Sequence, residues 1–285
     1  MSTEGCLFTF YTLTPLHAGA GDSAAAIDLP VQRERHTEYP VVYSSGIKGS
    51  LRYFFECNDT LKSHVNEIFG KENDESGGSG KVIFTDAKIL LFPVRSSEGV
   101  FKLVTSPFVL NRLQQDLALL DIPPQKIGLN LSVCKGLTFD SNYNEKRILL
   151  EDFPIELKTD TTAPELLKKL TVNHFFEEDI LKSRLIIVSD DVFKTLVTTA
   201  TQIIARNVLD NDTKKSDNLW YEEVVPPDAL FYTIMKPAFK GNTAITNLES
   251  GINGQVLQIG GNETIGYGLV RMSANRAGEL RKKGG

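Results

Sequence analysis

The chain has 285 residues, of which 41% are hydrophobic and 24% are charged, and its formal net charge is −5. This composition is typical of a globular protein with a sizeable core and excludes a disordered chain. The acidic balance argues against a simple basic nucleic-acid binder, although Lys and Arg gathered on one face would still serve RNA. Three widely spaced cysteines, no signal-peptide pattern and no long apolar run predict a reduced cytoplasmic protein without membrane contact.

The N-terminal part begins with a strand and reaches a helix through an irregular segment. Apolar and polar residues alternate over Cys6–Thr14, which predicts the strand. Residues 15–43 are glycine-rich and charged, without a helical or strand period. Apolar residues at helical spacing predict a helix over Gly46–Cys57, with Ser44 or Ser45 as its N-cap.

The middle of the chain mixes strands, helices and one low-complexity stretch. Residues 71–80 are rich in Gly, Ser and acidic residues, which predicts a mobile loop. The predicted strands are Val82–Val94, Phe101–Thr105, Ile148–Leu157 and Leu185–Val188. The predicted helices are Thr60–Phe69, Pro107–Leu120, Pro164–Leu170, Phe175–Leu181 and Asp190–Thr199.

The C-terminal part is dominated by strands. A polar turn at 210–216 separates the strands Gln202–Leu209 and Leu219–Val225, which predicts a hairpin. Further strands are predicted at Ala229–Met235, Gln255–Ile259 and Leu269–Ser273. Because strands and helices interleave with hairpins among them, we expect an α+β fold with mostly antiparallel sheets.

A Gly-Ile-Lys-Gly run is a candidate phosphate-binding element. Lys48 lies between Gly46 and Gly49, where a loop is expected to lead into a helix. The free N–H groups and positive dipole end of a helix N-terminus favour a phosphate. The spacing is not that of a P-loop, which argues against nucleoside triphosphate hydrolysis. A simple turn with a solvated lysine is the alternative.

A second glycine-rich loop joins two predicted strands near the C-terminus. Gly260, Gly261, Gly266 and Gly268 allow positive φ angles and close approach of a ligand. A β-hairpin with an awkward bend would need the same residues. The loop is not a dinucleotide fingerprint, because a strand rather than a helix follows it.

Four titratable residues are candidates for acid–base or metal chemistry. His17 and Asp28 belong to the irregular N-terminal segment, and Glu222 and Glu223 belong to the predicted hairpin. Carboxylates bind divalent cations or act as bases, and histidine transfers protons near neutral pH. The tight spacings of zinc and EF-hand sites are missing. A structural histidine and a turn-forming aspartate are the alternatives.

Basic residues occur in or beside loops, with aromatic residues close to them in the sequence. This combination suits single-stranded RNA, which proteins bind through its backbone and by base stacking. Surface charge paired with the abundant acidic residues is the alternative. The basic residues are Arg33, Arg35, Lys48, Arg52, Arg95 and Arg206, and the aromatic ones are Tyr39, Tyr43, Phe101 and Trp220.

An ordered set of motifs covers the chain from about Phe8 to Met272. The motifs are Pro-Leu-His-Ala-Gly-Ala-Gly at 15–21, Asp-Leu-Pro-Val-Gln-Arg-Glu-Arg-His at 28–36, Gly-Ile-Lys-Gly-Ser-Leu-Arg at 46–52, Pro-Val-Arg-Ser at 93–96, Leu-Trp-Tyr-Glu-Glu-Val-Val-Pro at 219–226 and Ile-Gly-Gly-Asn-Glu-Thr-Ile-Gly-Tyr-Gly at 259–268. Together and in this order they resemble the RAMP superfamily, specifically the repeated backbone subunit of Cmr (type III-B) CRISPR-Cas effector complexes.

The resemblance implies one elaborated domain over residues 1–285. It would contain a ferredoxin-like, RRM-type palm with an antiparallel sheet, inserted lobes and a thumb β-hairpin at 200–225. The implied partners are CRISPR RNA, a target single-stranded RNA, other Cmr effector subunits and further copies of the chain in a helical filament.

The resemblance also implies a metal-dependent endoribonuclease, with Mg²⁺ or Mn²⁺ as cofactor, that cuts target RNA at regular intervals. Asp28 would carry the cleavage and bind the metal, with His17 and either Glu222 or Glu223 in support. The implied RNA-binding residues are Gly46, Lys48, Gly49, Arg52, Arg95, Gly260, Gly261, Gly266 and Gly268.

Two other functions stay open on the sequence. The chain could be a non-catalytic RNA-binding scaffold of the same complex, in which Asp28 is only structural. It could also be a metal-free nuclease that processes precursor guide RNA, with His17 as its working group.

Overall fold

The computed structural model describes residues 4–23, 26–71, 78–160, 165–172, 174–209, 212–213 and 215–281. Most of the loop expected at 71–80 and part of the turn expected at 210–216 lie outside the described residues. Among the described helices, none combines the length and the apolar character needed to cross a membrane.

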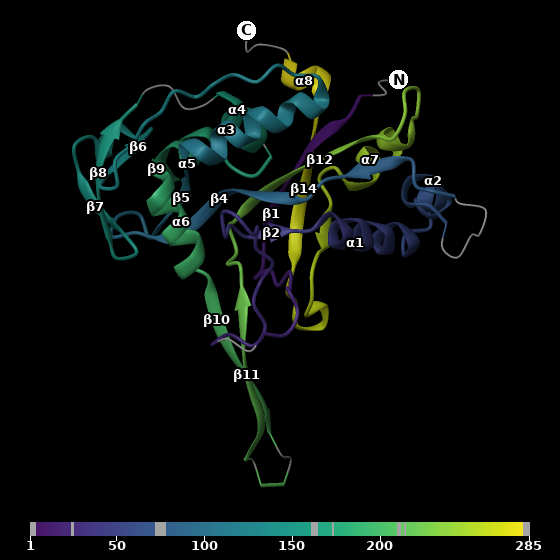
Figure 1. Ribbon diagram of the computed structural model, residues 1–285, viewed down its shortest axis with the longest axis horizontal. Coiled ribbons are helices and arrows are strands. Elements are labelled where there is room, and N and C mark those ends of the chain that lie inside the picture. Colours follow the sequence, from purple (N-terminus) through teal and green to yellow (C-terminus); the bar gives the residue numbers. More distant parts are fainter. Residues whose placement is uncertain are drawn as a thin grey trace.

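A four-stranded antiparallel unit with two helices forms the centre of the fold (Figure 1). Its elements in chain order are β1 (Cys6–Thr12), α1 (Ser44–Glu56), β4 (Ala87–Arg95), β12 (Leu230–Pro237), α7 (Ala244–Ile252) and β14 (Leu269–Arg276). The strands lie in the order β14-β1-β12-β4, and every neighbouring pair is antiparallel. This is the β-α-β-β-α-β arrangement of a ferredoxin-like unit, called the palm below. The expected α+β class is confirmed.

Helix α1 attaches to the palm through one apolar face. Ile47, Leu51 and Phe55 recur every four residues and are fully buried. The Phe55 ring packs against Phe69, with ring centroids 5.5 Å apart. A Cβ atom at Gly251 of α7 would lie 2.6 Å from the Phe55 ring, so the two helices are in close contact there.

The start of α1 differs from the expectation. The helix begins at Ser44, and its N-cap is Tyr43, whose side chain makes no capping hydrogen bond. The Ser44 N–H donates instead to Asp86 Oδ1 at 2.7 Å, so a carboxylate from a distant loop satisfies one free amide. The helix therefore begins two residues before the expected start at Gly46.

The sheet continues beyond β4 into an inserted lobe. Its order there is β4-β5-β9-β6-β8-β7, with parallel pairing in β5–β9 and β6–β8. These strands are β5 (Phe101–Thr105), β6 (Lys135–Thr138), β7 (Arg147–Leu150), β8 (Phe153–Thr159) and β9 (Leu185–Val188). The single strand expected at Ile148–Leu157 is wrong. Glu151, with φ of 50°, starts a turn that splits it into β7 and β8.

Helices and short strands complete the body. The strand expected at Val82–Val94 is also two strands, because residues 85–86 interrupt it. The short strands are β2 (Val41–Val42), β3 (Val82–Phe84) and β13 (Val256–Gln258). The remaining α-helices are α2 (Val65–Phe69), α3 (Pro107–Asp116), α4 (Glu165–Thr171), α5 (Glu178–Arg184), α6 (Asp190–Thr199) and α8 (Ala277–Arg281). The 3₁₀ turns are Lys62–His64, Leu117–Leu120, Ser141–Tyr143 and Glu263–Ile265.

A two-stranded hairpin projects from this body (Figure 1). It consists of β10 (Gln202–Leu209) and β11 (Ser216–Val224), which pair only with each other as strands. Between β1 and β2 the chain takes an irregular course. Its part over residues 15–31, called the crossing segment below, makes backbone hydrogen bonds to the base of the hairpin.

The packing of α1 generates a stability prediction. We expect Phe55→Ala to lower the free energy of unfolding by about 3–5 kcal/mol, because it leaves a cavity between α1, α2 and α7. Tyr53→Ala on the same helix removes a ring that is 60% exposed. That control should change stability by no more than about 0.5 kcal/mol. Chemical denaturation of the isolated subunit measures both, and equal losses would contradict the described packing.

Candidate functional site

The edge of β11 that faces away from β10 holds the crossing segment in place. Leu16 and Val225 exchange two backbone hydrogen bonds of 2.9 Å. The Glu223 N–H donates to the Leu29 carbonyl at 2.9 Å, and the Leu29 N–H donates to the Tyr221 carbonyl at 3.1 Å. Residues from the two ends of the crossing segment are thereby brought to the end of β11 and to Val225, which directly follows it.

Asp28 lies at one end of this pairing. Its Oδ2 atom accepts a hydrogen bond of 2.7 Å from the Tyr221 N–H. Its side chain is partly exposed, and the structure gives it no ion pair with a described residue. The carboxylate is therefore held at the surface, beside the base of the hairpin, with one oxygen free of protein donors in the described chain.

His17 lies two residues further along the same edge. Its Nδ1 atom is 2.8 Å from the Glu223 carbonyl oxygen and 3.6 Å from Glu222 Oε1. Tyr221 and Glu223 are separated by roughly 7 Å along an extended strand. The structure therefore brings His17 and Asp28, which the sequence had only suggested as a pair, to neighbouring positions on one strand.

The two hairpin glutamates point to opposite faces of β11, as successive strand residues must. Glu222 is 2% exposed and forms an ion pair of 3.0 Å with Arg206 Nε. The Asn262 amide also donates to Glu222 Oε1. Of the two glutamates, Glu222 is the one whose side chain is next to His17.

The Glu223 side chain lies on the opposite face of β11. It is 3% exposed, and Arg33 Nη2 lies 2.5 Å from its Oε1 atom. The Thr201 hydroxyl donates to the same oxygen at 2.7 Å, and the Val31 N–H donates to Oε2 at 3.0 Å. Both glutamates thus have their oxygens engaged by protein donors, which a buried carboxylate requires.

The side chains of this cluster include several groups that could bind a metal ion. Among the described residues, no group of three or more His, Cys, Asp and Glu side chains could hold a metal ion. Glu222 and Glu223 are engaged by arginines, which leaves Asp28 as the available carboxylate of the cluster. Mg²⁺ is often held by one or two carboxylates together with substrate phosphates and water. Asp28 fits an ion that RNA helps to bind, and does not fit one held by the chain alone.

The glycine-rich loop at 260–268 packs against the crossing segment. A Cβ atom at Gly260 would lie 2.4 Å from the His17 carbonyl oxygen, and one at Gly268 would lie 1.9 Å from the Ile259 carbonyl oxygen. The Gly261 N–H donates to the His17 carbonyl at 2.8 Å. The close approach that these glycines permit is therefore to the chain's own backbone. Gly266, in contrast, has open space around its Cβ position.

The Gly-Ile-Lys-Gly run occupies the first turns of α1. Gly46 and Gly49 are exposed, and a Cβ at either position would meet no atom within 4 Å. Lys48 is partly exposed and forms no ion pair with any residue in the described ranges. The N–H groups of Ser45 and Gly46 lie in the first turn of α1, where no helix carbonyl reaches them, and together with the Lys48 ammonium group they offer donors to an anion.

The two arginines expected to bind RNA are engaged within the chain. Arg52 donates to Glu56 Oε1 and to the Gly70 carbonyl, both at 2.8 Å. Arg95, at the end of β4, donates from Nε to Glu151 Oε2 at 2.7 Å. Their charges are partly compensated, so they offer less to a phosphate than Lys48 does.

Sequence reasoning missed two amide side chains of the site. Asn262 adopts a positive φ of 64° in the glycine-rich loop and reaches Glu222. The Gln32 carboxamide donates to the Gly19 carbonyl at 2.9 Å and accepts from the Tyr43 N–H at 2.8 Å. It thereby joins the crossing segment to the start of α1. An Asn among glycines is a weak sequence signal for the contact of Asn262 with Glu222. Nothing in the sequence indicates the contacts of Gln32.

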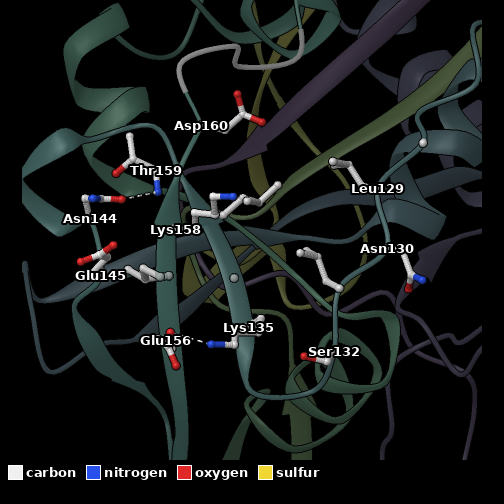
Figure 2. Close-up of a pocket in the computed structure, with 15 residues that line it drawn as sticks. Leu129, Asn130, Ser132, Lys135, Asn144, Glu145, Glu156, Lys158, Thr159 and Asp160 are labelled. Carbon is white, nitrogen blue, oxygen red and sulfur yellow. Dashed lines mark hydrogen bonds and ion pairs between the residues drawn. The ribbon is translucent and has the colours of Figure 1, made fainter.

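A separate cavity of about 880 Å³ lies in the inserted lobe (Figure 2). The segment Gly128–Ser132 forms one wall, and strands β6 and β8 form the other. A Lys135–Glu156 ion pair of 2.5 Å joins the two strands there. None of its lining residues belongs to the cluster on β11, so this cavity is separate from the candidate site.

The comparisons with known proteins agree with this architecture. A sequence model of the RAMP superfamily matches residues 9–271. The chain is 37% identical to the CRISPR system Cmr endoribonuclease Cmr4 of Pyrococcus furiosus, over 98% of this chain and 97% of that protein. It is 26% identical to the CRISPR system CMR subunit Cmr4 of Saccharolobus solfataricus, over 93% and 98% of the two chains. It superposes on the crystal structure of oligomeric Cmr4 from P. furiosus with a TM-score of 0.79 and 33% identity, covering 97% of this chain and 100% of that one.

The glycine-rich loop yields a test of what its glycines do. Gly266 and Gly268 both have positive φ, of 81° and 72°, so alanine at either incurs a similar backbone cost of about 1–2 kcal/mol. Gly268→Ala also forces an overlap with Ile259, which should destabilise the subunit by about 1–3 kcal/mol more. Thermal and chemical unfolding of the two variants measures the difference. Equal stabilities would argue that Gly268 is not needed for packing.

Proposed function

The chain belongs to the RAMP superfamily, and we propose that it is the repeated backbone subunit of an RNA-guided type III-B effector complex. In this role it binds CRISPR RNA, assembles with further copies of itself and other Cmr subunits, and cuts complementary target RNA as an endoribonuclease. Similarity over nearly the whole chain to a protein named as the Cmr endoribonuclease supports the proposal. The observation that carries it is the convergence of Asp28 and His17 on one edge of β11.

Cleavage within this cluster requires three tasks of the chain. It must align a phosphodiester with its attacking group, remove a proton and compensate phosphate charge. The neighbouring ribose 2′-hydroxyl of the target is the nucleophile, and Asp28 and His17 orient it and accept its proton. A divalent ion held jointly by Asp28 and RNA oxygens would compensate the phosphate charge.

The hairpin β10–β11 acts as the thumb that shapes the target strand at the cut. Along its length it carries apolar side chains that are about half exposed in the subunit, a pattern that marks an interaction surface. These residues are Ile203, Val208, Leu209, Leu219 and Tyr221. Inserted beside the guide–target duplex, these side chains would unstack one base-pair step. The RNA backbone at that step would then be exposed to Asp28. Palm, lobe and hairpin act as one elaborated domain in this arrangement.

The start of α1 binds the guide backbone. Base pairing reads the target sequence, so the protein needs grip on phosphates rather than contacts to base edges. Lys48 and the N–H groups of Ser45 and Gly46 in the first turn of α1 supply those phosphate contacts without a basic overall charge.

Asp28→Asn tests the catalytic assignment. The substitution preserves the size of the side chain and an oxygen that can accept from the Tyr221 N–H, but removes the charge. In the reconstituted complex we expect target cutting to fall by about 100-fold or more, with guide binding and assembly unchanged. Gel analysis of labelled target RNA measures the cutting.

The same assay separates the alternatives. A chelator should stop the wild-type complex, and Mg²⁺ or Mn²⁺ should restore it. Undiminished cutting by Asp28→Asn would refute the role of Asp28. If the wild-type complex cuts target RNA with neither ion, the non-catalytic scaffold function is supported. If it cuts precursor RNA in the presence of chelator, the metal-free processing nuclease is supported.

Lys48→Ala tests guide binding. We expect weaker binding of guide RNA and a salt slope, in log Kd against log salt, that is smaller by about one. Lys158→Ala is the matched control, because it removes one exposed positive charge at the separate cavity in the inserted lobe. Titrations at several salt concentrations measure both variants. Identical behaviour of the two would assign Lys48 to general surface charge.

A further inference from the structure

The environment of His17 determines which ring nitrogen carries the proton. Its Nδ1 atom is 2.8 Å from the Glu223 carbonyl oxygen, and a carbonyl oxygen only accepts hydrogen bonds. Nδ1 must therefore be the donor in this contact. In the neutral ring the other nitrogen, Nε2, then keeps its lone pair and is the atom able to accept a proton.

A buried carboxylate reinforces this arrangement. Glu222 Oε1 is 3.6 Å from His17 Nδ1, and its negative charge favours the tautomer in which Nδ1 carries the proton. Arg206 and Asn262 engage the two oxygens of Glu222 and fix its position. These are the charged and amide groups that the structure places around the Nδ1 side of the ring. Glu222 is in this sense a positioning residue for His17.

Gly19 borders the opposite side of the ring. A Cβ atom at Gly19 would lie 2.7 Å from His17 Nε2, closer than real side-chain atoms approach. Gly19 is exposed, its φ is not positive, and Gln32 holds its carbonyl at 2.9 Å. The backbone there does not need glycine for its own conformation. His17 is buried, with 8% of its surface exposed, and the missing side chain keeps the Gly19 side of Nε2 from being closed as well.

We infer that Nε2 of His17 is the atom that meets the target RNA, and that Gly19 is required because any side chain there would cover it. The inference rests on the proposed function and names the atom and the group in contact. The target's 2′-hydroxyl donates its proton to Nε2. As the proton moves, the bond from the 2′-oxygen to phosphorus forms, the bond from phosphorus to the 5′-oxygen breaks, and the departing oxygen takes a proton from water.

The protonation pattern can be measured without RNA or cleavage. The chain has four histidines, so ¹⁵N-labelled histidine gives few signals, and His17→Gln identifies the one of interest. At pH 8, where an ordinary imidazole is neutral, we expect the ¹⁵N shifts of His17 to be those of the ring protonated at Nδ1. A ring protonated at Nε2 would overturn the inference.

Substitution of Gly19 tests the access to Nε2. In the isolated subunit, diethyl pyrocarbonate should modify His17 at Nε2, and Gly19→Ala should slow that modification by about fivefold or more. Gly261→Ala is the matched control, because its Cβ would lie 3.5 Å from Cδ2 of the same ring, which is ordinary contact. Peptide mass spectrometry measures the modification. Equal rates in Gly19→Ala and the wild type would contradict the inference.

In the assembled complex, Gly19→Ala should lower single-turnover cutting by about tenfold or more with unchanged target affinity. If Gly19→Ala fails to fold, the ¹⁵N shifts and the reactivity of the wild type still decide the question. A wild-type complex that does not cut overturns the proposed function, whereas the tautomer and the reactivity of His17 are tested independently of it.

Discussion

The candidate site depends on hydrogen bonds along the edge of strand β11 that is not paired with β10. A strand whose other edge is already paired with β10 presents unpaired N–H and C=O groups, and buried backbone groups must find partners. The crossing segment supplies them at Leu16 and Leu29. Asp28 and His17 take the adjoining positions at Tyr221 and Glu223. The hairpin that projects from the body and the side chains proposed for catalysis are thus parts of one hydrogen-bonded unit.

Two buried carboxylates stabilise this unit from opposite faces. A charged group is buried only when it is paired and hydrogen-bonded, and Glu222 and Glu223 meet that condition through Arg206 and Arg33. Removal of either arginine would leave an uncompensated buried charge. The pairs therefore hold the base of the hairpin in register with the crossing segment, and Asp28 remains free for another partner.

The glycines of the chain divide into two physical classes. Gly260 and Gly268 allow two stretches of the chain's own backbone to approach within contact distance, so their role is in packing. Gly46 and Gly49 face open space on an exposed part of α1, where no side chain of their own limits the approach of a ligand. The sequence alone does not distinguish the two classes of glycine. Their surroundings in the folded chain do.

Much of the architecture follows from periodic patterns in the chain. Apolar spacing predicted α1, α3 and α6, because these helices bury one face at a regular period, and the polar turn at 210–216 predicted the hairpin. It failed at Glu151, where a non-glycine residue with positive φ divides β7 from β8. The α+β class was also within reach of the sequence, and so was the choice of His17, Asp28 and Glu222 as candidate residues. Tertiary structure alone decided which glutamate meets His17, which arginines are neutralised and which glycines are packed, because each depends on contacts between residues far apart in the chain.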